Sequence, residues 1–309
     1  MDWSNVAIVS DMRALEFSDA PTFLDRSREF LFSREVEHNL LLSSALTLAR
    51  SNAPRAQAVV FIAAIDSKNV TRGAALRSPN RRWIVSAPDS ETAEFFGSEI
   101  ARREPQARSL FVPTETNLNL LAKFIEESRL ELEPSITQNL MRLDRTKKVE
   151  PAEGLMRFAQ TKDLRKLVKW SHLFAKECGL DESPSEAEEV IRKYLQNKQL
   201  YVWEKGAEPL AMAAFGGITP KSVRLSMVYT DPMARARGYA STLVHRLTHK
   251  LLQEGHGSCV LFSDASNRSA NKIYENIGYK TVAQFTELRA LARAYKSPGN
   301  DLMAASSSR

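Results

Sequence analysis

Apolar residues recur along the chain in short blocks that predict an alternation of strands and helices. Runs rich in Val, Ile, Leu and Phe predict strands at 57–65, 71–77, 83–88, 109–112, 136–144, 155–159, 199–204, 209–217, 222–230 and 259–263. Apolar residues three and four positions apart predict helices at 89–103, 117–127, 164–174, 185–196, 239–254 and 267–276. This alternation is typical of an α/β or α+β fold.

The two halves of the chain repeat one order of elements. A strand at 83–88 leads through a helix and a second strand into the helix at 117–127, and a strand ending at Pro232 leads in the same way into the helix at 267–276. The second stretch contains an additional loop at 233–239. We interpret this as an internal duplication. Unrelated α/β segments can also share such an order.

A charged segment near residue 150 predicts a boundary between two domains. Residues 145–154 include Pro151 and Gly154 and interrupt the apolar periodicity. A chain of 309 residues is also long enough for two cores. We therefore expect an N-terminal domain, a linker, a second domain and a frayed or disordered tail, at 1–145, 146–154, 155–290 and 291–309.

The charge balance favours an anionic small-molecule ligand over nucleic acid. The formal net charge is +6 and the isoelectric point is near 9.3. Basic residues are scattered among acidic ones, and no basic stripe with interleaved aromatic residues is present. We expect no nucleic-acid partner, while a small anion would be attracted by such a balance.

The sequence indicates a cytoplasmic protein without a metal site. No apolar run approaches the roughly 18 residues that span a bilayer, and the N-terminus lacks a basic region followed by an apolar one. Cys178 and Cys259 are the two cysteines, too few for a disulfide framework or a thiolate metal site. We expect no membrane association. The sequence does not indicate the oligomeric state.

The segment 235–240, Arg-Ala-Arg-Gly-Tyr-Ala, carries the clearest chemical signal. It lies between an apolar strand ending near Thr230 and an amphipathic helix. Such a loop presents backbone N–H groups and the positive end of the helix dipole to an anion, as in a pyrophosphate site. Gly238 would let the backbone approach the phosphates, and Ala240 would keep the first helical turn close to them.

A second motif follows at the expected separation. The loop resembles the acyl-CoA loop R/Q-x-x-G-x-G/A of the GNAT superfamily, with Arg235, Gly238 and Ala240 at its defining positions. Residues 267–279, Asn-Arg-Ser-Ala-Asn-Lys-Ile-Tyr-Glu-Asn-Ile-Gly-Tyr, resemble the same superfamily's N-x-x-x-N-x-x-Y-x-x-x-G-F/Y ending. The layout resembles bacterial predicted acetyltransferases with tandem GNAT folds, and Ala236 departs from the R-G-x-G form frequent among them.

The resemblance implies a fold and a cosubstrate. It implies two tandem GNAT-like folds, each with a mixed, mostly antiparallel sheet flanked by helices, the N-terminal one degenerate. It also implies that acetyl-CoA is the acyl donor to an unidentified amine. The implied cofactor-binding residues are Met227, Val228, Tyr229, Arg235, Ala236, Arg237, Gly238, Tyr239, Ala240, Asn267, Asn271 and Tyr274.

Tyr274 is the implied catalytic residue. The amine would attack the thioester carbonyl directly, and the Tyr274 hydroxyl would protonate the departing thiolate. The alternative role of Tyr274 is a core aromatic side chain. The sequence does not identify a general base; Ser226, Tyr229, His172 and Glu204 remain candidates, each with a structural alternative.

The first half lacks these groups. Residues 86–94 contain no glycine or arginine, and their acids would repel a pyrophosphate. Phe124 occupies the position that corresponds to Tyr274 and has no hydroxyl. The sequence therefore predicts one working N-acetyltransferase domain. Two alternatives stay open, a CoA-binding regulatory pseudoenzyme and an N-acyltransferase for a longer acyl-CoA.

Overall fold

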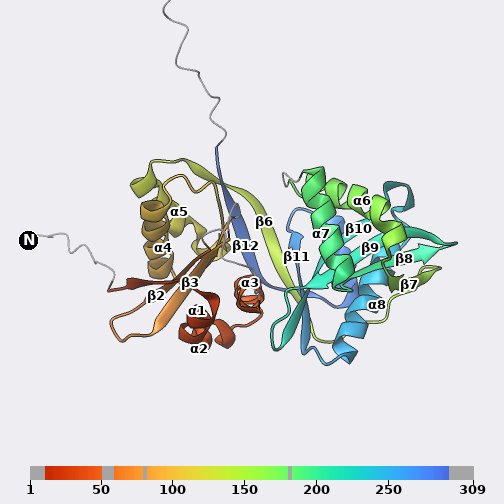
Figure 1. Ribbon diagram of the computed structural model, residues 1–309, viewed down its shortest axis with the longest axis horizontal. Helices are drawn as coiled ribbons and strands as arrows, with labels where there is room; N and C mark the ends of the chain where they lie inside the picture. Colours follow the sequence, from red (N-terminus) through yellow and green to blue (C-terminus); the bar gives the residue numbers. More distant parts are fainter. Residues whose placement is uncertain (1–10, 51–58, 79–81, 180–182, 292–309) are drawn as a thin grey trace, which may run out of the picture.

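The structure, a computed structural model, describes residues 11–50, 59–78, 82–179 and 183–291. Twelve strands form one sheet, and the two halves of the chain lie side by side with the long strands β6 and β12 between them (Figure 1). The elements of the first half are β1 (Arg13–Phe17), α1 (Ala20–Arg26), α2 (Arg28–Ser33), α3 (Asn39–Arg50), β2 (Val60–Ile65), β3 (Thr71–Arg77), β4 (Trp83–Ser86), α4 (Ser90–Arg103), β5 (Ser109–Pro113), α5 (Asn117–Ser128) and β6 (Leu132–Leu143).

The second half repeats this order of strands. Short 3-10 turns precede α5, α6 and α8. The elements are β7 (Leu155–Phe158), α6 (Leu164–Glu177), α7 (Pro184–Gln196), β8 (Leu200–Lys205), β9 (Glu208–Gly216), β10 (Ser222–Thr230), α8 (Tyr239–Gln253), β11 (Ser258–Asp264), α9 (Arg268–Ile277) and β12 (Lys280–Ala290).

The strand order has an internal two-fold symmetry. It reads β1-β2-β3-β4-β5-β12-β6-β11-β10-β9-β8-β7. Each strand of the first half has a counterpart six places later in the chain, so that β1 corresponds to β7 and β6 to β12. Exchanging every strand with its counterpart gives the same order read in reverse. The pairs β4/β5 and β10/β11 are parallel and the others antiparallel. This symmetry supports the duplication expected from the sequence.

Each half is completed by a strand of the other. β12, from the second half, lies between β5 and β6, and β6, from the first half, lies between β11 and β12. The long β6–β12 ladder therefore joins the halves through the centre of the sheet. The division at 146–154 stays a prediction. That segment contains no helix or strand, yet β6, which precedes it, pairs with strands of both halves.

Helices cover both faces of the sheet. On one face α4 and α5 pack over residues such as Ile62 and Val112, and α8 packs over Val223 and Leu225. On the other face lie α1–α3 and α6–α7. Between these two helical groups a small cluster joins the halves through Phe111, Leu140, Val260 and Phe285.

Most predicted elements are present within a few residues of their expected bounds. The sequence pattern predicted no elements at 13–50, where the structure has β1 and α1–α3. It also predicted no strand at the position of β12, and its strand at 136–144 begins four residues after the start of β6. α1 and α2 have seven and six residues, too few for a clear helical period. Nearly all of the expected tail lies outside the described residues. Within the described residues, no helix is long and apolar enough to cross a membrane.

Candidate active site

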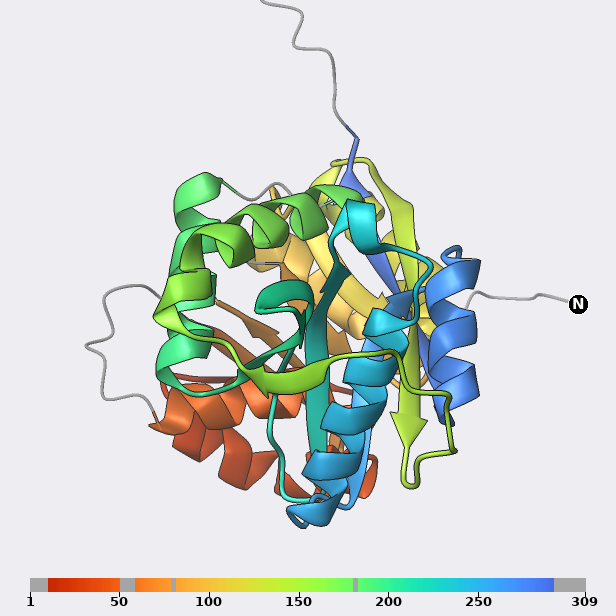
Figure 2. The same ribbon diagram turned by 90° about the vertical axis from the view of Figure 1, so that its right-hand side faces the viewer.

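Residues of both sequence motifs line one cavity in the C-terminal half. This half of the chain faces the viewer in Figure 2. Its volume is about 410 Å³, and it opens between the end of β10, the loop before α8, and α9. Ten of the residues predicted to bind the cofactor line it: Val228, Tyr229, Arg235, Ala236, Arg237, Gly238, Tyr239, Ala240, Asn267 and Tyr274. Met227 and Asn271 are outside this lining.

The inner end of the cavity forms where two parallel strands separate. β10 and β11 pair only over Ser222–Leu225 and Ser258–Leu261. Beyond Leu225 the β10–β9 register shifts between Ser226 and Tyr229, and Met227 has φ of +54°. A bulge of this kind turns backbone groups out of the ladder. The side chain of Met227 packs against α6 and α7.

The outer end of the cavity is the N-terminus of α8. Gly238 is the N-cap residue, with φ of +78° and no side-chain cap on the helix. Ala236 is also in the left-handed region, at φ of +60°. Backbone N–H groups in such a turn form a concave anion site, to which the helix dipole adds positive potential. Ala236 keeps this conformation without a glycine, at a steric cost of roughly 1–2 kcal/mol.

Arg235 lies at the mouth of the cavity in an ion pair. Its Nη2 donates to Glu177 Oε1 at 2.7 Å, and its guanidinium lies 5.2 Å from the centre of the Tyr229 ring. The hydrogen bond to Glu177 raises the pKa of Arg235. Glu177 is the one carboxylate among the described residues of the cavity lining. The sequence did not predict this residue, because the last turn of a helix carries no motif that indicates contact with a remote loop.

The two asparagines have different surroundings. Asn267 is the N-cap of α9, with its Oδ1 accepting from Ala270 N at 3.0 Å, and it lines the cavity. Asn271 is nearly buried, and its Nδ2 donates to the carbonyl oxygens of Asp264 and Ala265. These bonds satisfy carbonyl groups where β11 ends. Asn271 thus supports the turn that presents Asn267.

Tyr274 meets the cavity from α9. It is 8% exposed, and its ring packs edge-on against Tyr279 with centroids 6.0 Å apart. Burial raises the pKa of Tyr274 well above its usual value, and the nearby Cys178 thiol adds to this. The phenol is therefore protonated at neutral pH. A protonated hydroxyl on a cavity wall is able to act as a general acid.

Residues 205–289 match the family model described as FR47-like protein. These residues include the loop 235–240, the strands β10 and β11, and α9. The segment that carries the cavity therefore resembles a GNAT-superfamily domain. Mycothiol acetyltransferase of Brachybacterium faecium is 28% identical over 93 residues, which are 30% of this chain and 26% of that protein. The match spans about a quarter of that relative's length.

Solved structures support a tandem GNAT fold for both halves. A GCN5-related N-acetyltransferase from Sphaerobacter thermophilus aligns with a TM-score of 0.57 and 14% identity, over 90% of this chain and 95% of that one. A tandem GNAT protein from the clavulanic acid biosynthesis pathway aligns with a TM-score of 0.54 and 10% identity, over 90% and 98%. At these identities the likeness shows the fold alone.

Of the four candidate bases, only Tyr229 lines the GNAT cavity. Burial raises its pKa, so the phenol stays protonated and is a poor base. Glu204, on the far strand β8, is bound to Arg157 of β7. His172 is outside the cavity lining. Ser226 lies at the strand separation, 3.1 Å from the hydroxyl of Tyr194.

The corresponding cleft of the first GNAT-like half is closed by its own side chains. Asp89 caps α4 by accepting from Thr92 N at 2.8 Å, so a carboxylate stands where α8 leaves its N-terminus open. Thr116 donates to the carbonyl oxygen of Ala87 at 2.9 Å and ties α5 to the end of β4. Both contacts occupy groups that a cofactor would need, and at the position corresponding to Tyr274 the sequence alignment has Phe124, which is fully buried.

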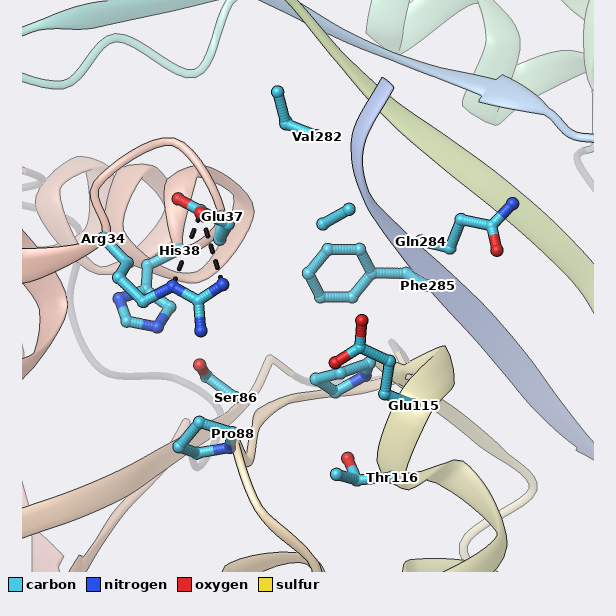
Figure 3. A pocket seen from close by; sticks show the side chains of 12 residues that line it. Arg34, Glu37, His38, Ser86, Pro88, Glu115, Thr116, Val282, Gln284 and Phe285 are labelled. Carbon is cyan, nitrogen blue, oxygen red and sulfur yellow. Dashed lines mark hydrogen bonds and ion pairs between the residues drawn. The ribbon is translucent and has the colours of Figure 1, made fainter. Parts of the chain in front are cut away.

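A space of about 70 Å³ lies near the ends of β4 and β5 (Figure 3). Arg34, bonded to Glu37, and the side chains of Glu115 and Phe285 surround it. Phe285 comes from β12 of the other half. The space is about one sixth of the volume of the C-terminal cavity. Among the described residues there is no cluster of His, Cys, Asp and Glu that could hold a metal, and both cysteines are free thiols.

Proposed function

We propose that the protein is an N-acetyltransferase that uses acetyl-CoA in its C-terminal half alone. One observation carries the proposal: the N-terminus of α8 is uncapped at the mouth of a cavity, whereas the matching helix α4 is capped by Asp89. An anionic pyrophosphate fits an uncapped helix N-terminus and is repelled by a carboxylate there. The relative with mycothiol acetyltransferase activity supports the same reaction class.

The cofactor would lie along the cavity with its phosphates at the loop 235–240. The pantetheine arm would follow Val228 and Tyr229 to the point where β10 and β11 separate, with Asn267 on its other side. This order places the thioester near Ser226 and Tyr274. A backbone N–H freed by the bulge would then be available to the oxyanion.

The reaction would be direct transfer in a ternary complex. The neutral amine attacks the thioester carbonyl, the C–S bond breaks, and Tyr274 gives its proton to the thiolate. The proton of the amine goes to solvent, because the described residues of the cavity lining include no histidine and one carboxylate, Glu177, which is paired with Arg235 at the mouth. This route needs an acceptor that is already deprotonated when it attacks.

Calorimetry with acetyl-CoA tests the proposal most directly. We expect one site per chain, and release of free thiol when an amine is added. Two equivalent sites would contradict the account of the capped first half. One site without thiol release for any amine would favour the alternative of a CoA-binding regulatory protein, and faster release from longer acyl-CoA donors would favour the alternative donor.

A further inference from the structure

Arg224 lies on β10 beside the proposed thioester position. It pairs with Val260 inside the parallel ladder, and Ser226 is the first residue beyond that ladder. Side chains alternate along a strand, so Arg224 and Ser226 share the face opposite α8, about 7 Å apart along the strand. Leu225, between them, packs on the α8 side. Arg224 therefore belongs to the face from which an amine would approach.

The positive charge of Arg224 has no carboxylate partner among the described residues. Its Nη1 donates to Asn39 Oδ1 at 2.6 Å and to Ser43 Oγ at 3.3 Å, both neutral groups of α3. For Nε and Nη2 the described residues provide no acceptor. Burial lowers the pKa of Arg224 to about 10. A desolvated cation without a counter-ion is costly, and an anionic ligand would remove much of that cost.

Two buried carboxylates of this region have other partners. Glu35 accepts from Thr219 Oγ1 and from Lys221 N, both at 2.6 Å. Glu287 bonds Arg82 at 2.9 Å, Arg289 at 2.9 Å and Ser109 at 2.8 Å. Arg82 is itself close enough to Arg224 for its charge to oppose that of Arg224. Arg224 and Ser226 are both half-buried and keep some exposure.

We infer that the acceptor is an amine that carries a carboxylate, and that Arg224 binds this carboxylate and so determines acceptor specificity. The inference rests on the proposed acetyltransferase function. A guanidinium presents two parallel N–H groups that match a carboxylate, and Nε and Nη2 form one such pair. With the carboxylate held there, the amine of a short amino acid lies toward Ser226 and the thioester. The positive charge also favours the neutral amine that must attack.

Matched acceptor pairs test the inference. Thiol release from acetyl-CoA is measured with amino acids, glycine and β-alanine among them, and with their carboxamides, on wild type, Arg224→Gln and Arg224→Lys. We expect wild type to prefer the carboxylates, and Arg224→Gln to lower kcat/KM for them by about 10- to 100-fold while leaving the amides nearly unchanged. Arg224→Lys should recover only part of the preference, since lysine keeps the positive charge and lacks the two parallel N–H donors of the guanidinium.

Asn39→Ala is the matched control, because it removes the shorter of the two contacts of Arg224 with α3 and keeps the guanidinium and its contact with Ser43. It should keep the carboxylate preference. If it abolishes the preference as Arg224→Gln does, or if wild type uses amides as well as acids, Arg224 only links the halves and the inference is overturned.

A binding measurement separates this inference from the proposed function. N-acetylglycine and its amide are titrated into protein saturated with CoA, and the shift in the thermal midpoint is followed. Stabilisation by the acid, absent in Arg224→Gln, supports the site even if no amine is acetylated, in which case the proposed function fails. Equal stabilisation by the amide, or none by either compound, contradicts the inference whatever the turnover.

Discussion

Glu177 and Arg235 face each other across the mouth of the cavity, joined at 2.7 Å between Oε1 and Nη2. Their side chains are 52% and 47% exposed, so the pair itself contributes little to stability. Its importance is electrostatic. Glu177 places a negative charge at the position that the cofactor's phosphates would approach. It also forms an ion pair with Arg235, the arginine that would face those phosphates.

We therefore expect Glu177→Gln to tighten acetyl-CoA binding by about two- to five-fold at low salt, with a smaller gain at high salt. Calorimetry at two ionic strengths measures this. Glu188→Gln on α7, which removes a carboxylate paired with Arg192 outside the cavity lining, is the control and should leave the affinity unchanged. Weaker binding by Glu177→Gln would mean that Glu177 positions Arg235 for the cofactor.

Gly238→Val should weaken acetyl-CoA binding by at least about 100-fold. A Cβ at this position would meet only Ala152 at 3.8 Å, so the protein itself has space for it. The cost lies in the left-handed backbone, which a β-branched residue avoids, and in the space needed by the phosphates. Gly206→Val is the matched control, since Gly206 has φ of +60° and no neighbour within 4 Å. A folded Gly238→Val variant with normal affinity would exclude the loop as the phosphate site.

Ala236→Gly should stabilise the protein by about 1 kcal/mol, because alanine is strained at φ of +60°. Thermal unfolding checks this. Ala207→Gly, at φ of +64° in the turn before β9, should give a similar gain. Acetyl-CoA affinity should be kept in both variants. A loss of affinity in Ala236→Gly alone would indicate that the stiffness of alanine preorganises the loop.

The two motifs that line the cavity could be recognised in the sequence because each of them is local. The loop 235–240 and the segment 267–274 each lie directly after a strand, so strand-to-helix connectivity alone places them at the same edge of the sheet. Arg224 and Glu177 were not predictable in the same way. Arg224 contacts Asn39, and Glu177 pairs with Arg235. Each of these contacts joins segments that are far apart in the sequence, so no local pattern indicates it.

The exchange of β6 and β12 could not be predicted from the sequence either. Residues 280–290 mix polar and apolar positions, and their partners are 109–113 and 132–142. Local pattern specifies a strand without specifying which strand it joins. The symmetry of the strand order shows why the duplication was visible: both copies keep the same local elements, while the exchanged strands lie outside the matched stretch.

The strand exchange predicts that neither half folds alone. Without β6, a fragment of residues 146–309 would leave β11 unpaired on one side and β12 without its partner ladder. Unpaired edges of this length favour aggregation. We expect separate fragments 1–145 and 146–309 to be poorly folded by circular dichroism and hydrogen exchange, and to form a native complex when co-expressed. A well-folded 146–309 fragment that binds acetyl-CoA would contradict this.

Tyr274→Phe tests the proposed chemistry most sharply. The change removes one hydroxyl and keeps the ring that packs on Tyr279, so stability and acetyl-CoA affinity should change little. The rate of the chemical step should fall by about 10²-fold, at the low end for general acid catalysis, because a thiolate is a tolerable leaving group. Since burial keeps the pKa of Tyr274 high, wild-type kcat should show no loss of this acid up to about pH 10.

Tyr279→Phe is the matched control for this change. It also removes a phenol hydroxyl, one that is bonded to Thr248 at 2.8 Å in the core, and it should lower stability without lowering the chemical rate. Single-turnover kinetics are required, because product release can mask the chemical step in kcat. A single-turnover rate unchanged in Tyr274→Phe would leave Tyr274 as a packing residue and would require another proton donor for the thiolate, with Tyr229, protonated and in the same cavity, next to be tested.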